Sequence, residues 1–468
     1  MTDVLFIQPP NVQGTLFNLP GAEVPLSVMS VSAYLKREGY SSEIWDLTLD
    51  RRPEEALARL LAGNAPHAVG ITSYTTNMDL AADIASKVRA AWPKTKLVVG
   101  GFHASALPER TIREYPVFDV LVHGEGEVTM VELLEAWGRG DDGTDVHGTA
   151  FRENGHVRMN PPRDLLRDLD ALPYADRDAV PVTRYVPDPG NYASLPTTGI
   201  LYSRGCPAPC TFCSKSVFLD SVRYRTPQSF LDEIRTCKRD YGIHDFRLYD
   251  EGPTFKRRHM EALCDEILAS GLRFSWNCFS RVDVADEELL TMMRDAGCYH
   301  IIYGVESVVP ETQRRIRKRI DAERVREVCR LTRKLGIECK ANFILGFPWE
   351  GEDEAEQNVR FALGLDADLV TFNLFKPMPG SPLYDEMSER GAIRDLPWKE
   401  FFTTSNSELF ESRLDEHAQK RILKWAWMRF YFSPKSIRRR LERLVRHPVV
   451  ETRKVARGLG VLLVNLFK

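Results

Sequence analysis

The sequence lacks an apolar run that could cross a membrane, because the best candidate, residues 461–467, falls far short of the roughly 20 residues that a spanning helix needs. It also lacks the basic start and apolar stretch of a secretory signal, and Asp3 stands near its beginning. Neither sign of charge prevails, since 63 Lys and Arg residues face 66 Asp and Glu residues, which argues against a protein that coats nucleic acid. We therefore expect a cytoplasmic protein without a nucleic-acid partner.

Repeats and low-complexity segments are also missing, and 468 residues at roughly 150 per domain predict about three folded units. In residues 1–140 short apolar runs alternate with helical patterns, which predicts a doubly wound, Rossmann-like parallel sheet. Residues 141–195 are rich in turns and prolines and predict a connector with a hairpin at residues 153–155. The alternation resumes in residues 196–390, which predicts a partial (β/α)6 TIM-type barrel, and residues 391–468 form a predicted helical region. The predicted strands span residues 4–7, 43–47, 68–73, 97–99 and 120–122, then 200–203, 246–249, 274–278, 300–305, 340–345 and 369–374.

Cysteine is scarce, with nine in the chain, yet Cys206, Cys210 and Cys213 stand together directly after a predicted strand. Thiolates at this spacing converge on one inorganic centre. Structural zinc normally has four protein ligands, and no second cysteine pair or nearby histidine completes that set. A four-iron cluster on three cysteines instead keeps one iron open for a small-molecule ligand. The other six are expected to be buried thiols: Cys237, Cys264, Cys278, Cys298, Cys329 and Cys339.

The loop Cys-x3-Cys-x2-Cys, with Phe212 before its last cysteine, resembles the radical S-adenosylmethionine (SAM) superfamily. This resemblance covers residues 196–390 and implies a 4Fe-4S cluster on the three cysteines. Further motifs follow in the family's order and imply a SAM site made by Phe212, Asp250, Glu251, Arg281, Glu306, Ile344 and Gly346. In that site the acidic pair at 250–251 holds the amino group, Glu306 faces the ribose and residues 343–348 line the adenine.

Two features of this segment leave alternatives open. An acidic pair at a strand end is, by itself, typical of a solvated turn or a helix N-cap. Trp349 departs from the family's Pro-Gly-Glu-Thr pattern, and it either reshapes the pocket rim or packs in the core. The resemblance implies that the open iron binds SAM, and that one electron from a flavodoxin- or ferredoxin-type donor yields a 5′-deoxyadenosyl radical. No further catalytic residue is assigned.

Glycines follow two strands of the first unit, at Gly100-Gly101 and at Gly124-Glu125-Gly126, where backbone can approach a bulky ligand. These loops resemble the cobalamin-binding domain that precedes many radical SAM barrels, and the resemblance covers residues 1–140. It implies cobalamin contacts at Ser73, Tyr74, Gly100, Gly101, His103, Gly124, Glu125 and Gly126.

The first unit departs from the methionine-synthase type of cobalamin module, whose cobalt-binding Asp-x-His-x-x-Gly element is replaced by Gln8-Pro9-Pro10-Asn11. We therefore expect cobalt without a protein histidine ligand and a lower face shielded by Tyr74 or its neighbours. We expect His103 to contact a loop or the cofactor's tail rather than cobalt.

The combined resemblance implies methylation of an unactivated carbon in a small-molecule or lipid-like intermediate, with SAM and methylcobalamin as reactants. The same two-domain plan also resembles cobalamin-dependent cyclases and rearrangement enzymes that transfer no methyl group. A third possibility, from a different class, is a non-catalytic cobalamin or cluster sensor.

The end of the chain is basic, with ten Lys or Arg residues against two Glu residues in residues 434–468. Aromatic residues precede this segment from Trp425 onward, a composition typical of an interfacial helix. One hypothesis is peripheral contact with the inner face of the membrane and a lipidic substrate such as a polycyclic isoprenoid, and the alternative is a helix packed on the barrel. The basic run at residues 314–319 predicts a solvated helix face or a contact with substrate phosphates.

Overall fold

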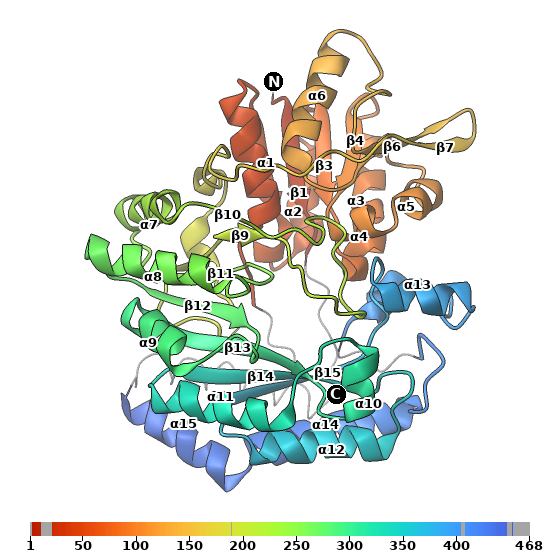
Figure 1. Cartoon of the computed structure of the whole chain (residues 1–468). Coiled ribbons are helices and arrows are strands. Elements are labelled where there is room, and N and C mark those ends of the chain that lie inside the picture. Colours follow the sequence, from red (N-terminus) through yellow and green to blue (C-terminus); the bar gives the residue numbers. More distant parts are fainter. Residues whose placement is uncertain (1, 11–20, 189, 404–407, 447–451, 453–468) are drawn as a thin grey trace.

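The structure is a computed structural model that describes every residue except 1, 11–20, 189, 404–407, 447–451 and 453–468. It contains two α/β units, and Figure 1 shows the first above the second. Helices α14 (Glu416–Tyr431) and α15 (Pro434–Arg446) run along the lower edge, outside the second sheet. None of the described helices is both long enough and apolar enough to span a bilayer.

The first unit is built on a seven-stranded sheet in the order β2-β1-β3-β4-β5-β6-β7. Its first five strands are parallel, as predicted, and their order changes direction around β1, so the crevice beyond β1 and β3 is a topological switch point. The strands are β1 (Val4–Gln8), β2 (Ser42–Asp46), β3 (Ala68–Thr72), β4 (Lys96–Gly100), β5 (Val120–Val122), β6 (Thr149–Glu153) and β7 (His156–Met159).

The predicted hairpin forms at Asn154 and Gly155, which both have positive φ, at 51° and 80°. Strand β6 pairs antiparallel with β5, and β7 pairs antiparallel with β6 as the new edge of the first sheet. The first sheet therefore extends beyond residue 140 through the hairpin of the predicted connector.

Helices cover both faces of the first sheet because its strands are apolar on both sides. Helices α1 (Leu26–Arg37) and α6 (Gly126–Gly138) pack on the face that carries Phe6. The opposite face is covered by α2 (Pro53–Leu61), α3 (Met78–Ala91), α4 (Phe102–Ala106) and α5 (Pro108–Glu114).

The second unit is a parallel six-stranded sheet in the order β15-β14-β13-β12-β11-β8. Consecutive strands are neighbours, as in a barrel wall, and the described residues form no closed barrel. The strands are β8 (Thr197–Ile200), β11 (Asp245–Leu248), β12 (Ser275–Ser280), β13 (Cys298–Glu306), β14 (Glu338–Leu345) and β15 (Leu369–Leu374). Five match the predicted strands within a few residues, whereas β8 ends where the sequence predicted it to begin, because the chain turns there into a short two-stranded ribbon.

That ribbon consists of β9 (Ser203–Arg204) and β10 (Arg223–Tyr224), which pair antiparallel and bracket the three cysteines. Outer helices pack apolar residues on the sheet, and three of them begin at Thr226, Asp286 and Asp321, whose side chains cap backbone N–H groups. These helices are α7 (Pro227–Tyr241), α8 (Arg257–Ser270), α9 (Glu287–Asp295), α10 (Pro310–Arg315), α11 (Ala322–Lys334) and α12 (Glu352–Gly364).

The C-terminal region touches both units. Helix α14 packs on α12 and β15, whereas Trp398, Phe401 and Phe410 join the core of the first unit. An isolated bridge between Ile393 and Phe410 precedes these helices. The remaining short elements are α13 (Pro382–Glu389), η1 (Leu47–Leu49), η2 (Thr75–Asn77), η3 (Arg177–Ala179), η4 (Val182–Arg184) and η5 (Trp398–Phe401).

Candidate active site between the two units

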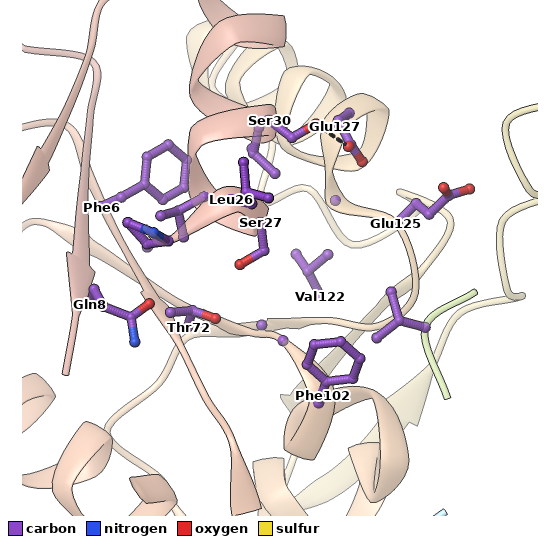
Figure 2. Close-up of a pocket in the computed structure, with 18 of the residues that line it drawn as sticks. Phe6, Gln8, Leu26, Ser27, Ser30, Thr72, Phe102, Val122, Glu125 and Glu127 are labelled. Atoms are coloured by element: carbon purple, nitrogen blue, oxygen red, sulfur yellow. Dashed lines mark hydrogen bonds between the residues drawn. The ribbon is translucent and has the colours of Figure 1, made fainter. Parts of the chain in front are cut away.

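A cavity of about 450 Å³ opens at the carboxyl ends of β1, β3, β4 and β5. Figure 2 shows side chains from the sheet, from α1 and from the α6 loop around this space. Its walls are mainly apolar, and its deep part lies between the first sheet and helices α1 and α6. The lining residues there include Phe6, Gly70, Val98, Val122, Val28 and Met130.

The glycine loops form the mouth of this cavity. Gly101 has φ +96°, and a Cβ at this position would lie 2.7 Å from the carbonyl oxygen of Ser73, so a side chain here would force the loops apart. Gly124 has φ +81° and borders open space. Of the eight predicted cobalamin residues, six line the cavity: Tyr74, Gly100, Gly101, Gly124, Glu125 and Gly126.

The structure does not place Ser73 and His103 among the lining residues. Ser73 is buried and its hydroxyl donates to the carbonyl oxygen of Gly100 at 2.8 Å, which ties two loops together. The His103 ring lies 3.3 Å from the Thr75 hydroxyl and 4.5 Å, between ring centroids, from Trp398. Burial, with a smaller effect of Arg110, lowers the pKa of His103 to about 3, so its ring is neutral at physiological pH.

The second unit completes the cavity with Leu201, Arg204, Val217, Phe218 and Tyr249. Val217 and Phe218 follow the last cysteine of the loop, so one cavity borders both the glycine loops and the cysteine segment. The sequence gives no signal for the four apolar or aromatic residues among them, because nothing in their type distinguishes them from core residues.

A buried ion network joins the two units beside the cavity. Arg204 binds Glu125 at 2.8 Å and Glu127 at 2.7 Å, and Arg223 binds Glu125 at 2.9 Å. Burial would raise the pKa of Glu127, but Arg204 holds that pKa below its ordinary value. Glu125 therefore lines the cavity and also forms ion pairs with the second unit. Its partner Arg204 lies two residues before Cys206.

The three cysteines lie at the carboxyl ends of β11 and β12. A Cβ on Gly252 would lie 3.5 Å from Cys206 Sγ, and Arg281 Nη1 lies 4.0 Å from Cys210 Sγ. Among the residues the structure describes, no three His, Cys, Asp or Glu side chains are close enough to share a single metal ion. Gly252 and Arg281 therefore border the thiols of this loop.

Burial raises the pKa of Cys206, and burial with the neighbouring thiols raises that of Cys213 to about 12. Without a nearby positive charge these thiols would stay protonated. The iron of a bound cluster would supply that charge, because metal binding to cysteine stabilises the thiolate. Arg281 is itself held by Asp283 at 2.7 Å and by the Lys318 carbonyl oxygen at 3.0 Å.

Asp250 and Glu251 have separate surroundings. Asp250 is buried and accepts hydrogen bonds from the Ser203 hydroxyl at 2.5 Å and from Tyr202 N at 3.1 Å, and burial raises its pKa to about 6. Its carboxylate therefore holds the turn before the cysteine loop. Glu251 remains solvent-accessible, yet its low-dielectric surroundings raise its pKa to about 7, and it is the member of the pair free to meet a ligand.

Glu306 adopts φ +66° and pairs with Lys318 at 3.0 Å. Lys318 is buried, and its Nζ also lies 5.9 Å from the centroid of the Phe212 ring. The run at residues 314–319 is therefore not a continuous solvated helix face, since α10 ends at Arg315 and the chain then turns Lys318 toward the cysteine loop.

Ile344 is the second-last residue of β14, and Gly346 begins the turn after this strand. Gly346 has φ +75°, and its N–H donates to Glu350 Oε2 at 3.1 Å. Trp349 stacks on Phe347 and donates to the Thr312 hydroxyl at 2.9 Å, so it packs beneath this turn.

Polar side chains line the inner face of the second sheet. Arg247 on β11 pairs with Glu23 at 2.6 Å, and Lys340 on β14 makes no hydrogen bond or ion pair within the described part of the chain. Burial, together with Arg247, lowers the pKa of Lys340 to about 8. The buried Asn342 Oδ1 likewise has no hydrogen-bond donor there.

This arrangement defines an enzyme with a cysteine-bound cluster site and a cofactor cavity at a shared interface. Comparison with known proteins identifies both units: residues 13–134 match the B12 binding domain and residues 200–362 match the radical SAM superfamily. The protein is a cobalamin-binding radical SAM enzyme, and its cofactors are cobalamin, SAM and a 4Fe-4S cluster.

Individual relatives span most of the chain. It is 28% identical over 457 residues to an uncharacterized methyltransferase of Pyrococcus horikoshii, with 97% of each chain covered. It is 29% identical over 409 residues to an anaerobic magnesium-protoporphyrin IX monomethyl ester cyclase of Cereibacter sphaeroides, covering 86% of this chain and 66% of the relative. The radical SAM methyltransferase TsrM from Kitasatospora setae, solved with cobalamin and a 4Fe-4S cluster, shares the fold with a TM-score of 0.72, 19% identity and coverage of 93% and 90%.

The residues present fit these cofactors. Apolar walls suit the flat rings of cobalamin, and the backbone of the glycine loops can meet its polar groups. Cys206, Cys210 and Cys213 would hold the cluster, and Glu251 and Arg281 would place charges of opposite sign beside it.

Proposed function

We propose that the protein methylates an unactivated carbon of a small molecule. The observation that carries this proposal is the single cavity lined by both the glycine loops and the residues that follow the cysteine loop. When bound, the cluster with SAM supplies a 5′-deoxyadenosyl radical, and cobalamin supplies the methyl group. A shared cavity would let both groups act on one substrate carbon without release of a radical to water.

The residues of the chain have distinct tasks in this proposal. Glu251 accepts a hydrogen bond from the SAM amino group, and Lys318 keeps Glu306 oriented toward the ribose. Phe6, Phe218 and Tyr249 exclude water from the space between the cofactors. These tasks are binding and positioning, as expected where the cofactors carry the chemistry.

The inner face of the second sheet favours a substrate with a hydrogen-bond donor. The buried Asn342 Oδ1 has no donor among the described residues, and a substrate N–H or O–H group would satisfy it. Lys340, on the same strand, already has Asp188 and Glu338 as neighbouring charges of opposite sign.

Cyclisation or rearrangement without methyl transfer is the second candidate. It is favoured by one observation, the 29% identity to the protoporphyrin monomethyl ester cyclase. The two reactions differ in the fate of the SAM methyl group, so isotope labelling separates them.

The test uses anaerobically purified protein loaded with cobalamin, a flavodoxin or ferredoxin reducing system, methyl-deuterated SAM and an extract of the producing cells. Methylation predicts 5′-deoxyadenosine together with a product that gains a deuterated methyl group in mass spectrometry. The variant Cys210→Ala, which lacks one cluster ligand, should form neither product. Deoxyadenosine without label transfer supports cyclisation or rearrangement, and neither product from the intact protein favours a non-catalytic sensor.

A further inference from the structure

Basic residues of helix α15 bind the helix to the second unit through ion pairs and hydrogen bonds. Arg439 is 4% exposed and bonds to Asp366 and to the carbonyl oxygen of Ala367, and Arg443 pairs with Glu338 at the amino end of β14. These contacts place one face of α15, made by positions 435, 439 and 443, on the barrel.

The opposite face of α15 is apolar and is not covered by the described residues. Ile437, Leu441 and Val445 recur every four residues and are 46%, 57% and 82% exposed. An ordinary surface helix has the reverse arrangement, with its apolar stripe on the core. Arginines, and not apolar residues, attach α15 to the second unit. The apolar stripe is therefore exposed and can contact a partner outside the protein.

Charge surrounds this stripe. Arg438 and Arg440 lie on its two sides and are exposed, and α15 carries six Lys or Arg residues against Glu442 alone. The sequence that follows, residues 447–468, adds four Lys or Arg residues and one Glu. A second copy of this helix would bring like charges together, whereas an anionic surface would neutralise them.

We propose that α15 is a docking surface for an anionic lipid membrane, with Ile437, Leu441 and Val445 inserted among the acyl chains. An apolar face bordered by arginines is the arrangement of a helix that lies in the plane of the interface. Figure 1 places α15 at the outer edge of the second unit, on the far side from the cobalamin unit. Docking would therefore leave the cavity between the units uncovered by the bilayer.

Flotation with vesicles tests this proposal on the full-length, cofactor-loaded protein. The wild type should float with vesicles of phosphatidylcholine and phosphatidylglycerol at low salt, and binding should weaken with added salt. The triple substitution I437S/L441S/V445S should lower the vesicle affinity by about tenfold or more. The pair R438Q/R440Q should lower it by about fivefold per charge, and only for anionic vesicles.

Leu268→Ser is the matched control, because Leu268 is 48% exposed on α8 and belongs to no such stripe. It should float like the wild type, and every variant should keep its cobalamin absorbance and cluster content. Failure of the wild type to bind anionic vesicles at low salt would overturn the proposal. Unchanged flotation of the triple variant would also overturn it, as would a concentration-dependent dimer that the triple substitution abolishes.

Discussion

Arg281 is a cationic side chain close to a cysteine sulfur, with its Nη1 4.0 Å from Cys210 Sγ. A positive charge there stabilises the reduced cluster, which carries one more negative charge than the oxidised one. We expect Arg281→Met to shift the cluster's midpoint potential to more negative values by on the order of 50 mV, since Asp283 already screens part of the charge. Potentiometric titration followed by EPR of the reduced cluster measures this shift.

Arg294→Met provides the control for that measurement, because Arg294 pairs with Asp295 on the surface of α9. The midpoint potential of the cluster in the Arg294→Met variant should match that of the wild type. Equal potentials in Arg281→Met and Arg294→Met would show that Arg281 exerts no charge effect on the cluster.

The neutral ring of His103 gives a pH-dependent prediction. Its folded-state pKa of about 3 lies below the ordinary value of 6.5, so the native state resists protonation and loses stability as pH falls below 6.5. Relative to His103→Gln, the wild type should lose about 1.4 kcal/mol per pH unit between pH 6.5 and 4.5. Urea unfolding at several pH values, followed by tryptophan fluorescence, gives this difference, and parallel profiles for the two proteins would contradict the assignment.

Residue type alone identified the cysteine loop, because three rare side chains stand within eight positions. It could not separate Asp250 from Glu251, since only the fold shows that backbone groups already occupy Asp250. Lys318 was hidden in a run of arginines, and its approach to Glu306 depends on left-handed backbone at the residues on either side of it. The acidic repeat Glu125 and Glu127 was the one available signal for the ion network around Arg204.

At the scale of elements, ribbon β9 and helix α6 are joined by Arg204. Arg204→Gln would leave the buried Glu127 with hydrogen bonds from Ser30 and a backbone N–H but without its described cation, a loss of about 3 to 5 kcal/mol. We expect a lower melting temperature and faster loss of cobalamin during gel filtration. Arg139→Gln, at the exposed end of α6, should change neither quantity.

Sequence periodicity predicted strands well because nearly every strand of both sheets is buried and apolar on at least one face. It could not place the hairpin β6–β7 on the sheet, since edge pairing depends on backbone groups and not on side-chain pattern. The orientation of α15 was equally inaccessible, because Asp366 and Glu338, which bind its arginines, are more than 70 residues away in sequence.

The whole molecule brings the carboxyl ends of two parallel sheets to a common interface. The cysteine loop is bracketed by residues that also line the cavity proposed to hold cobalamin, with Arg204 before it and Phe218 after it. The two proposed cofactor sites therefore share the segment that carries the cysteine loop. Occupation of the cavity should restrict the motion of the loop that holds the cluster.

Cobalamin should consequently protect the cluster. With cobalamin bound, we expect the iron–sulfur absorbance to decay several-fold more slowly in the presence of an iron chelator than in cobalamin-free protein. Gly101→Ala should lose this protection, because its Cβ would clash with the Ser73 carbonyl oxygen at the cavity mouth, far from the cysteines in sequence. Gly140→Ala, which has a similar φ but open space around it, should retain the protection. Equal decay rates with and without cobalamin in the wild type would mean that the two sites, although adjacent, are energetically independent.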